Sequence, residues 1–149
     1  FVPAEPAVRV NALTALCGAG AAALFFRLAR EATGHRIASA GAALLLAFTP
    51  TLWQQSLSTE VYALGALLLA AALWQALRAV DAPQDPAPVR WLALLLGVGL
   101  THNLAMALFL PGFVLLAVTR PSSWRRSLAE WLRLAGLFVL PLCAYLTLP

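Results

Sequence analysis

The sequence contains little charge and no lysine. Charged residues make up 11% of its 149 positions, hydrophobic residues make up 62%, and all ten basic residues are arginine. A soluble domain is about half apolar and about a quarter charged. The composition therefore excludes an ordinary soluble domain and indicates an all-α, polytopic integral membrane protein, with the lipid bilayer as its first partner. The net charge of +4 does not indicate a nucleic-acid partner, because the arginines gather in short loops between apolar runs.

Cysteine is also scarce, and the motifs of soluble enzymes are missing. Cys17 and Cys143 both lie in apolar runs, without the spacing of a disulfide framework or a zinc site, so we predict that both are buried as small hydrophobic residues. The sequence has no phosphate-binding glycine loop, no nucleophile elbow and no evident internal repeat. It begins Phe1-Val2-Pro3 without an initiator methionine, and we expect it to be a fragment of a longer protein.

The apolar runs predict about six transmembrane segments in a single transmembrane domain. A hydrocarbon core of about 30 Å requires about 20 apolar residues in a helix. Prolines and polar turns separate the runs. A basic stretch with two tryptophans, residues 120–133, predicts an interfacial segment. The expected helices cover residues 7–30, 37–55, 59–79, 90–101, 103–119 and 131–148.

Two of these expected helices are short. The apolar residues 90–100 and 104–118 are separated by Thr101-His102-Asn103, and neither run comfortably crosses a bilayer. They form either two short helices that meet at a polar vertex or one long broken helix. The charge pattern favours the vertex, because it requires an even number of crossings here. Irregular backbone at membrane depth is tolerated only where it lines a cavity or is buried in protein.

The arginines orient the predicted helices. They cluster after the first, third and fifth apolar runs, and these loops share one face if the chain crosses six times. The positive-inside rule places that face in the cytoplasm. Asn11, Glu60 and the pair His102-Asn103 then meet on the outer face. The alanine-rich composition with arginine as its only basic residue favours a bacterial inner membrane.

Glu60 is the main candidate for a functional residue. It is the only acidic residue between Glu31 and Asp81, and it lies where an apolar helix is expected to begin. A carboxylate at the edge of a membrane raises the free energy of the protein unless it is paired with a cation, is hydrated or has a functional role. It is either a helix-start residue favoured by the helix dipole, with Ser58 or Thr59 as the cap, or a contact to substrate or metal. The neighbouring polar side chains favour a contact: Gln54, Gln55 and Ser56.

Two further candidates lie in the second polar segment. Histidine is rare inside a membrane, so His102 is a candidate for binding a phosphate when protonated or for relaying a proton. Asn103 follows it directly. The alternative for both residues is a polar turn that forms hydrogen bonds with itself.

The remaining candidates begin the first helix or flank the Glu60 region. Arg9 and Asn11 begin the first helix, where a contact to a lipid headgroup and a helix cap would also explain them. Trp53 and Tyr62 lie on either side of the Glu60 region. An aromatic belt at the membrane interface explains these two rings without a functional role.

Four segments in this order carry a resemblance to a known family. They are VRVNAL at 8–13, LLAFTPTLWQQS at 45–56, TEVYAL at 59–64 and GLTHNL at 99–104. Together they resemble the protein O-mannosyltransferase-like family, a domain-of-unknown-function family within the GT-C superfamily of membrane glycosyltransferases. The resemblance covers about residues 7–119, and the stretch from Trp53 to Tyr62 is its most specific part.

The resemblance implies a function and a donor. GT-C enzymes transfer a sugar, here with mannose as the candidate, from a polyprenyl-phosphate carrier to a protein or glycan acceptor on the periplasmic or lumenal face. Transfer is usually inverting, with a carboxylate as base. The principal acidic motif of the family lies in the first outer loop, upstream of the helix that carries Asn11. We therefore expect this chain to lack the main catalytic carboxylate.

The resemblance also implies roles for individual residues. It gives Glu60 an auxiliary role, as a contact to the acceptor, to a metal ion or to the donor phosphate. A divalent metal is the one cofactor that it leaves open. The family usually carries histidine directly before the leucine of the second polar segment, whereas this chain has Asn103 there and His102 one position earlier. A shift of one residue turns a helical side chain by about 100°.

Two other classes of function remain as alternatives. A non-catalytic transporter or flippase module would also use broken helices that meet at polar residues, although no inverted repeat is evident. A membrane scaffold subunit is the third alternative, and Glu60 and His102 argue against it. An acidic outer loop upstream of Asn11 would favour the enzyme.

Overall fold

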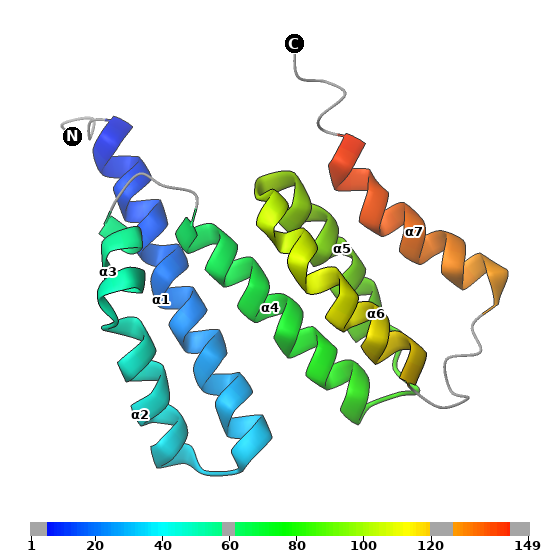
Figure 1. Cartoon of the computed structure of the whole chain (residues 1–149), viewed down its shortest axis with the longest axis horizontal. Coiled ribbons are helices and arrows are strands. Elements are labelled where there is room, and N and C mark those ends of the chain that lie inside the picture. Colours follow the sequence, from blue (N-terminus) through cyan, green and yellow to red (C-terminus); the bar gives the residue numbers. More distant parts are fainter. Residues whose placement is uncertain (1–5, 58–61, 120–126, 144–149) are drawn as a thin grey trace. The chain divides into compact units, whose positions relative to one another are not determined.

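The computed structural model describes residues 6–57, 62–119 and 127–143, with the backbone alone for 115–119. Every regular element in this part of the chain is a helix, as Figure 1 shows, which confirms the all-α prediction. The chain divides into two compact units, residues 1–71 and 72–149, and the single transmembrane domain that we expected stays a prediction. The division falls within helix α4 (Tyr62–Asp81).

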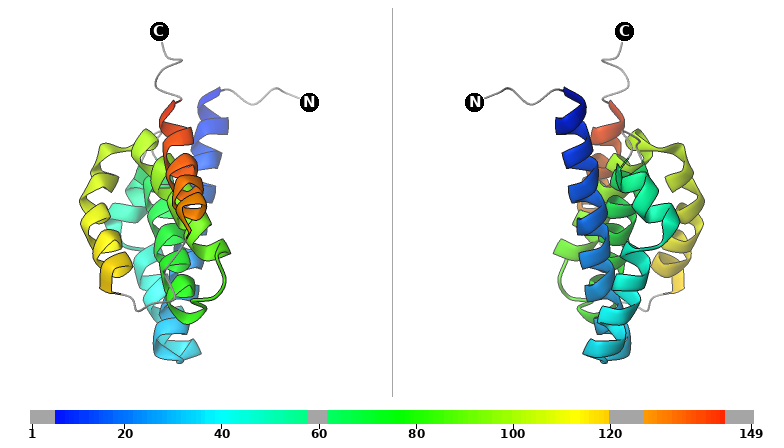
Figure 2. Two further views of the ribbon diagram at one scale, coloured as in Figure 1. Left: turned by 90° about the vertical axis from the view of Figure 1, so that its right-hand side faces the viewer. Right: turned by 90° about the vertical axis from the view of Figure 1, so that its left-hand side faces the viewer.

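The first unit begins with a helical hairpin. Helix α1 (Pro6–Thr33) ends at Gly34, whose φ of +72° lies in the left-handed region that favours glycine. The Gly34 N–H donates to the Arg30 carbonyl at 2.9 Å, which closes the end of the helix. The chain then turns into helix α2 (Arg36–Ala47), which lies antiparallel beside α1 in Figures 1 and 2.

The single helix that we expected over residues 37–55 is two helices. Helix α3 (Pro50–Leu57) follows α2 after a bend of 57°. Pro50 has no N–H to donate to the Leu46 carbonyl, and it disfavours the helical conformation at the preceding residue. Thr49 instead donates two hydrogen bonds to the Leu46 carbonyl, from its N–H at 3.2 Å and from its Oγ1 at 2.8 Å.

Small residues set the packing of the first unit. Thr14, Cys17, Gly18 and Ala21 form the buried stripe of α1. A Cβ built on Gly20 would lie 3.1 Å from a methyl group of Leu67 in the first half of α4. Close helix packing through small residues is typical of membrane helices. Cys17 is buried as predicted, whereas the same prediction for Cys143 is wrong, because it lies exposed where the last helix ends.

The second unit combines the second half of α4 with three further helices, of which α5 and α7 pack closely against each other. These are α5 (Ala87–His102), α6 (Leu110–Thr119) and α7 (Leu128–Leu142). One buried cluster joins Ala72 and Ala76 of α4 to Leu92 and Leu96 of α5. A second cluster joins Ala79, Val89 and Leu134, and it places the starts of α5 and α7 at the end of α4.

The chain reverses direction at Asn103, which is the vertex that the charge pattern favoured over one long broken helix. The 3₁₀-helix η1 (Leu104–Phe109) follows α5 and contacts it. Phe113 of α6 packs against the cluster that contains Leu96. Figure 1 shows α6 running in the direction opposite to α5. Pro111 explains where the α-helix begins, since proline is tolerated in the first turn but would break the hydrogen bonds of a helix interior.

Among the residues that the structure describes, two helices, α1 and α4, are long and apolar enough to cross a membrane, and the bent pair α2–α3 makes a third if it counts as one span. The six spans that we predicted are not shown. Helix α5 has 16 residues, or about 24 Å of helix, and α7 has 15. The proline and polar interruptions that separated the expected spans also shorten these helices.

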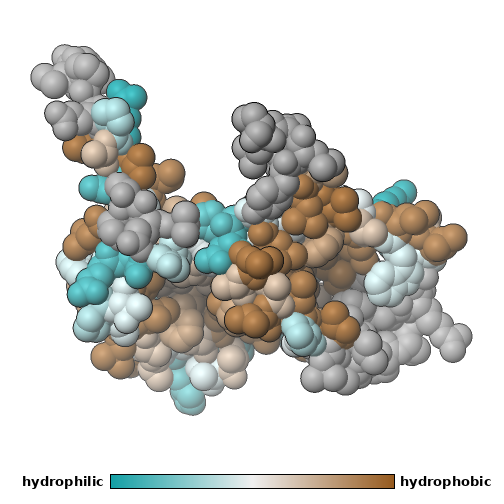
Figure 3. All heavy atoms as spheres, turned by 45° about the horizontal axis from the view of Figure 1, so that its top comes forward, coloured by the Kyte–Doolittle hydropathy of each residue, from teal (hydrophilic) through white to brown (hydrophobic). Residues whose placement is uncertain are grey.

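The surface supports association with a membrane. Leu16, Leu45 and Leu108 are 70%, 75% and 80% exposed, and many other large apolar side chains are exposed with them. Figure 3 shows brown apolar side chains over much of the face that it presents. Monomeric soluble proteins rarely expose continuous apolar patches of this kind, whereas lipid chains cover them at little cost.

Candidate functional site

Helix α3 presents the polar residues that follow the bend. Trp53 is 50% exposed, and its ring stacks on Phe48, with 5.6 Å between ring centroids and 26° between planes. Gln54 is exposed beside it, whereas Gln55 is partly buried and its Oε1 has no hydrogen-bond partner among the described residues. The side chains of Trp53 and Gln54 are therefore exposed on the helix that follows the bend at Phe48–Thr49.

Helix α3 is held against α1 by one close contact. A Cβ built on Gly18 would lie 2.1 Å from Ser56 Oγ and 3.0 Å from Ser56 Cβ. The Ser56 hydroxyl donates to the Leu52 carbonyl at 2.7 Å, so it bonds within its own helix. The absence of a side chain at Gly18 leaves room for the Ser56 hydroxyl, which would have to shift if a larger residue stood there.

An apolar pocket of about 230 Å³ lies between α1 and the α2–α3 bend. Small residues of α1 form one wall, and the ring of Trp53 and the hydroxyl-bearing Ser56 belong to the other. Its lining residues are Ala15, Gly18, Ala19, Ala47, Phe48, Leu52, Trp53, Ser56 and Leu57. The pocket can accept hydrocarbon, with polar groups only near its edge.

The other candidates of the first unit lie near the same end. Arg9 and Asn11 are exposed in the first turns of α1, where Thr14 Oγ1 donates to the Asn11 carbonyl at 2.9 Å. Tyr62, 52% exposed, begins α4. Figure 1 shows the start of α1, helix α3 and the start of α4 at one end of this unit. Glu60 lies outside the described residues, so its role stays a prediction.

His102 and Asn103 lie in the second unit, at the vertex. Asn103 Oδ1 accepts a hydrogen bond from the Ala105 N–H at 2.9 Å, and the Asn103 N–H donates to the Gly99 carbonyl at 2.8 Å. Asn103 is thus the N-terminal cap of η1, and His102 is the partly buried last residue of α5. That these two residues meet the Glu60 region stays a prediction, because they belong to the other unit.

One polar cluster was missed by the sequence interpretation. Glu130 in the first turn of α7 accepts hydrogen bonds from Arg90 Nε and Nη2 at 3.0 and 2.5 Å, and from Arg133 Nη1 at 3.3 Å. We assigned both arginines only to cytoplasmic loops. The spacing of Ser127 and Glu130 offered a signal, since serine three residues before glutamate marks a helix start, and the Glu130 N–H does donate to Ser127 Oγ at 3.4 Å.

Arg90 and Arg133 also change the pKa of the Glu130 carboxyl group. The hydrogen bond from Arg90 lowers the pKa of Glu130 below its ordinary value of 4.5, and the charges of both arginines act in the same direction. The Glu130 side chain is only 15% exposed. Among the described residues, no three His, Cys, Asp or Glu side chains form a group that could hold a metal ion.

Comparison with models of known families gives one match. Residues 1–127 match the model described as "Protein O-mannosyl-transferase TMEM260 N-terminal domain". No curated protein matches the chain, and no solved structure matches it. The match confirms the resemblance seen in the four sequence segments and extends it to the start of the chain.

Proposed function

The chain belongs to the family of the protein O-mannosyl-transferase TMEM260 N-terminal domain, and on this premise we propose that it transfers mannose from a polyprenyl-phosphate carrier to a hydroxyl group of a protein acceptor. The family match, which covers residues 1–127, is the observation that carries the proposal. It also favours an enzyme over the transporter module and the scaffold subunit.

The first unit offers surfaces that suit such a donor. A polyprenyl phosphate has a long apolar chain and an anionic head. The apolar pocket beside Trp53 suits part of the chain. The exposed guanidinium of Arg9 near the same end of the unit suits the phosphate. His102, which belongs to the second unit, is the alternative phosphate contact when it is protonated.

The reaction itself is a displacement at the anomeric carbon of the sugar. The acceptor oxygen forms a bond to this carbon, the bond from the carbon to the phosphate oxygen breaks, and the polyprenyl phosphate leaves as an anion. A carboxylate takes the proton of the acceptor hydroxyl. Glu60 is proposed as an auxiliary contact to the acceptor, to a metal ion or to the donor phosphate.

The other candidate residues are proposed as substrate contacts. Trp53, Gln54 and Tyr62 would contact the sugar or the acceptor beside Glu60, together with Asn11 on the first turns of α1. Asn103 would contact the substrate through its side-chain amide. The proposal includes the orientation given by the positive-inside rule, with the arginine loops in the cytoplasm of a bacterium and the Glu60 region on the outer face of its inner membrane.

The test measures sugar transfer by the full-length product of the gene that encodes this chain. Membranes that contain wild-type protein or Glu60→Gln receive polyprenyl-phosphate [³H]mannose, and tritium in protein is counted. Loss of a transition-state contact should lower transfer by about 10²–10³-fold. Glu31→Gln is the matched control, because it makes the same chemical change in the last turn of α1 and should leave transfer within about twofold.

Three outcomes would count against parts of the proposal. Equal transfer by wild type and Glu60→Gln would limit Glu60 to the start of a helix. A similar loss in both variants would indicate a general effect of removing a carboxylate. No transfer by the folded wild-type protein with this donor would overturn the proposed reaction, and uptake of the lipid-linked sugar without transfer would indicate a transporter.

A further inference from the structure

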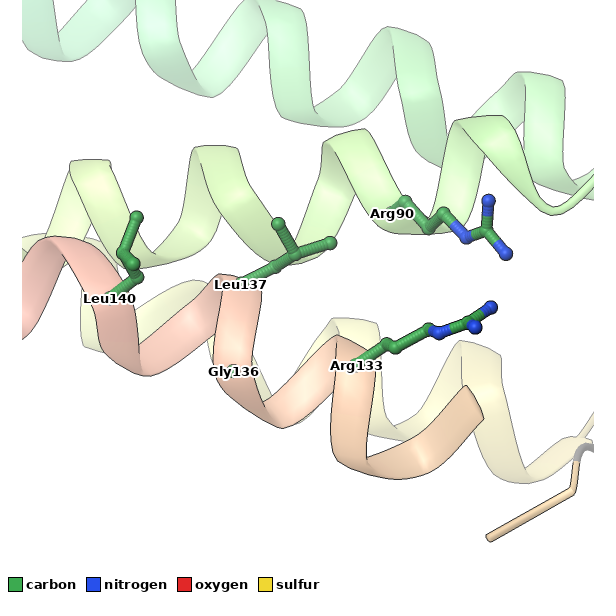
Figure 4. A pocket seen from close by; sticks show the side chains of 5 residues that line it. All are labelled: Arg90, Arg133, Gly136, Leu137 and Leu140. Carbon is green, nitrogen blue, oxygen red and sulfur yellow. The ribbon is translucent and has the colours of Figure 1, made fainter. Parts of the chain in front are cut away.

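Two arginines from different helices converge beside an apolar groove in the second unit. Arg90 lies in the first turn of α5 and Arg133 in the second turn of α7. Figure 4 shows both side chains extending in the same direction from their helices. The groove has a volume of about 470 Å³, and its other lining residues are Gly136, Leu137 and Leu140.

Glu130 holds the two guanidinium groups side by side. Its Oε1 accepts from Arg90 and its Oε2 accepts from Arg133, so each carboxylate oxygen serves a different arginine. The carboxylate is 15% exposed, whereas the side chains of Arg90 and Arg133 are 39% and 68% exposed. The trio carries a net charge of +1. Each guanidinium has five N–H donors, so donors remain for an anion.

Exposed tryptophans mark this end of the unit as a membrane interface. Trp91 follows Arg90 and is 55% exposed, and Trp131, two residues before Arg133, is 49% exposed. Tryptophan rings are enriched at headgroup depth. Leu140 follows Arg133 by seven residues, or about 10 Å of helix, so the groove leads from the cationic groups along an apolar helix face.

We propose that this groove binds one anionic glycerophospholipid. Arg90 and Arg133 hold its phosphate, and one acyl chain lies over Gly136, Leu137 and Leu140. Gly136 is central, because a Cβ built there would meet nothing within 4 Å and the open space continues the groove. Two adjacent guanidinium groups beside an apolar groove match a phospholipid, whereas a free phosphate would contact only the guanidinium groups. The proposal does not depend on the proposed sugar transfer.

The test is native mass spectrometry of the whole chain in a non-ionic detergent. The protein is titrated with phosphatidylglycerol or with phosphatidylcholine of identical acyl chains, and bound lipids are counted. We expect one phosphatidylglycerol to be retained about fivefold more strongly, because the trio has a net charge of +1 and one basic charge near an anionic lipid contributes about 1 kcal/mol. Arg133→Gln should remove this preference, whereas Arg36→Gln, with the same charge change at the start of α2, should retain it.

A second variant tests the apolar half of the site without weakening the helix. Gly136→Leu should fill the groove and lower retention of phosphatidylglycerol, and leucine has the higher helix propensity. Gly41→Leu is its control, since a Cβ there also meets nothing within 4 Å. Equal retention by Gly136→Leu and wild type would overturn the acyl-chain contact. Equal binding of both lipids, or complete displacement by inorganic phosphate, would overturn the lipid site.

Discussion

Gly97 of α5 lies against the backbone of Phe138 in α7. A Cβ built on Gly97 would be 2.3 Å from the Phe138 carbonyl oxygen and 3.0 Å from its carbonyl carbon. Backbone atoms cannot turn aside as a side chain can. The absence of a side chain at Gly97 therefore sets how closely α5 and α7 approach, and with it the spacing of Arg90 and Glu130 about two turns earlier.

Gly97→Ala should destabilise the second unit. The added methyl group must push α7 away, and overpacking of this kind costs about 1–3 kcal/mol. The free energy of unfolding is measured by titration of the detergent-solubilised protein with sodium dodecyl sulfate. Gly136→Ala is the control on the facing helix, where the Cβ meets open space; it should be neutral or stabilising by up to about 1 kcal/mol. An unchanged midpoint for Gly97→Ala would show that the helices do not touch there.

Gly18 and Ser56 should show coupled effects on stability. Gly18→Ala places a methyl group 2.1 Å from Ser56 Oγ, so we expect a loss of about 1–3 kcal/mol. Ser56→Ala removes this oxygen, and the double variant should cost less than the sum of the single variants, by about 0.5 kcal/mol or more. The same titration measures all three proteins. Additive costs would contradict the packing of α3 on α1.

The sequence predicted the fold best where the signal was local. The long apolar run of α1 and the polar residues around Asn103 indicated a helix and a reversal, and both are present. Pro50 also pointed to the bend, although we extended one helix through it. A proline shows where the hydrogen-bond pattern breaks, but it does not set the bend angle, which is 57° here.

Long-range pairs could not be predicted in the same way. Glu130 lies among arginines in the sequence, and nothing local indicates that Arg90, forty residues earlier, donates to it. The close approach of Gly97 to Phe138 likewise arises from the packing of two separate helices. For the candidate site, Arg9 and Asn11 lie in the first turns of α1 and Tyr62 begins α4, and the roles of all three residues stay predictions. The apolar pocket was missed, because its walls come from three helices.

Glu130 should make stability depend on pH. Its pKa is lower in the folded protein than the ordinary 4.5 because Arg90 and Arg133 favour the charged form. The ion pairs therefore stabilise the fold above about pH 4.5, and this contribution is lost as the pH falls through the lower, folded pKa. Unfolding curves between pH 3 and 7 should show wild type losing stability below pH 4.5 relative to Glu130→Gln. Parallel curves for the two proteins would contradict this role, and high salt should reduce the difference.

Asn103 offers a way to separate a structural role from a substrate contact. Asn103→Ala removes the oxygen that caps η1 at the Ala105 N–H, so it should lower the free energy of unfolding by about 1 kcal/mol. Asn103→Ser keeps a cap oxygen but lacks the amide donors. We expect the serine variant to retain wild-type stability while its transfer of mannose from polyprenyl phosphate falls, because the amide is the part of Asn103 that the cap does not use. Titration with sodium dodecyl sulfate and the tritium assay measure the two properties in parallel. Full transfer by a stable serine variant would limit Asn103 to capping, and it would leave His102 as the candidate at the vertex.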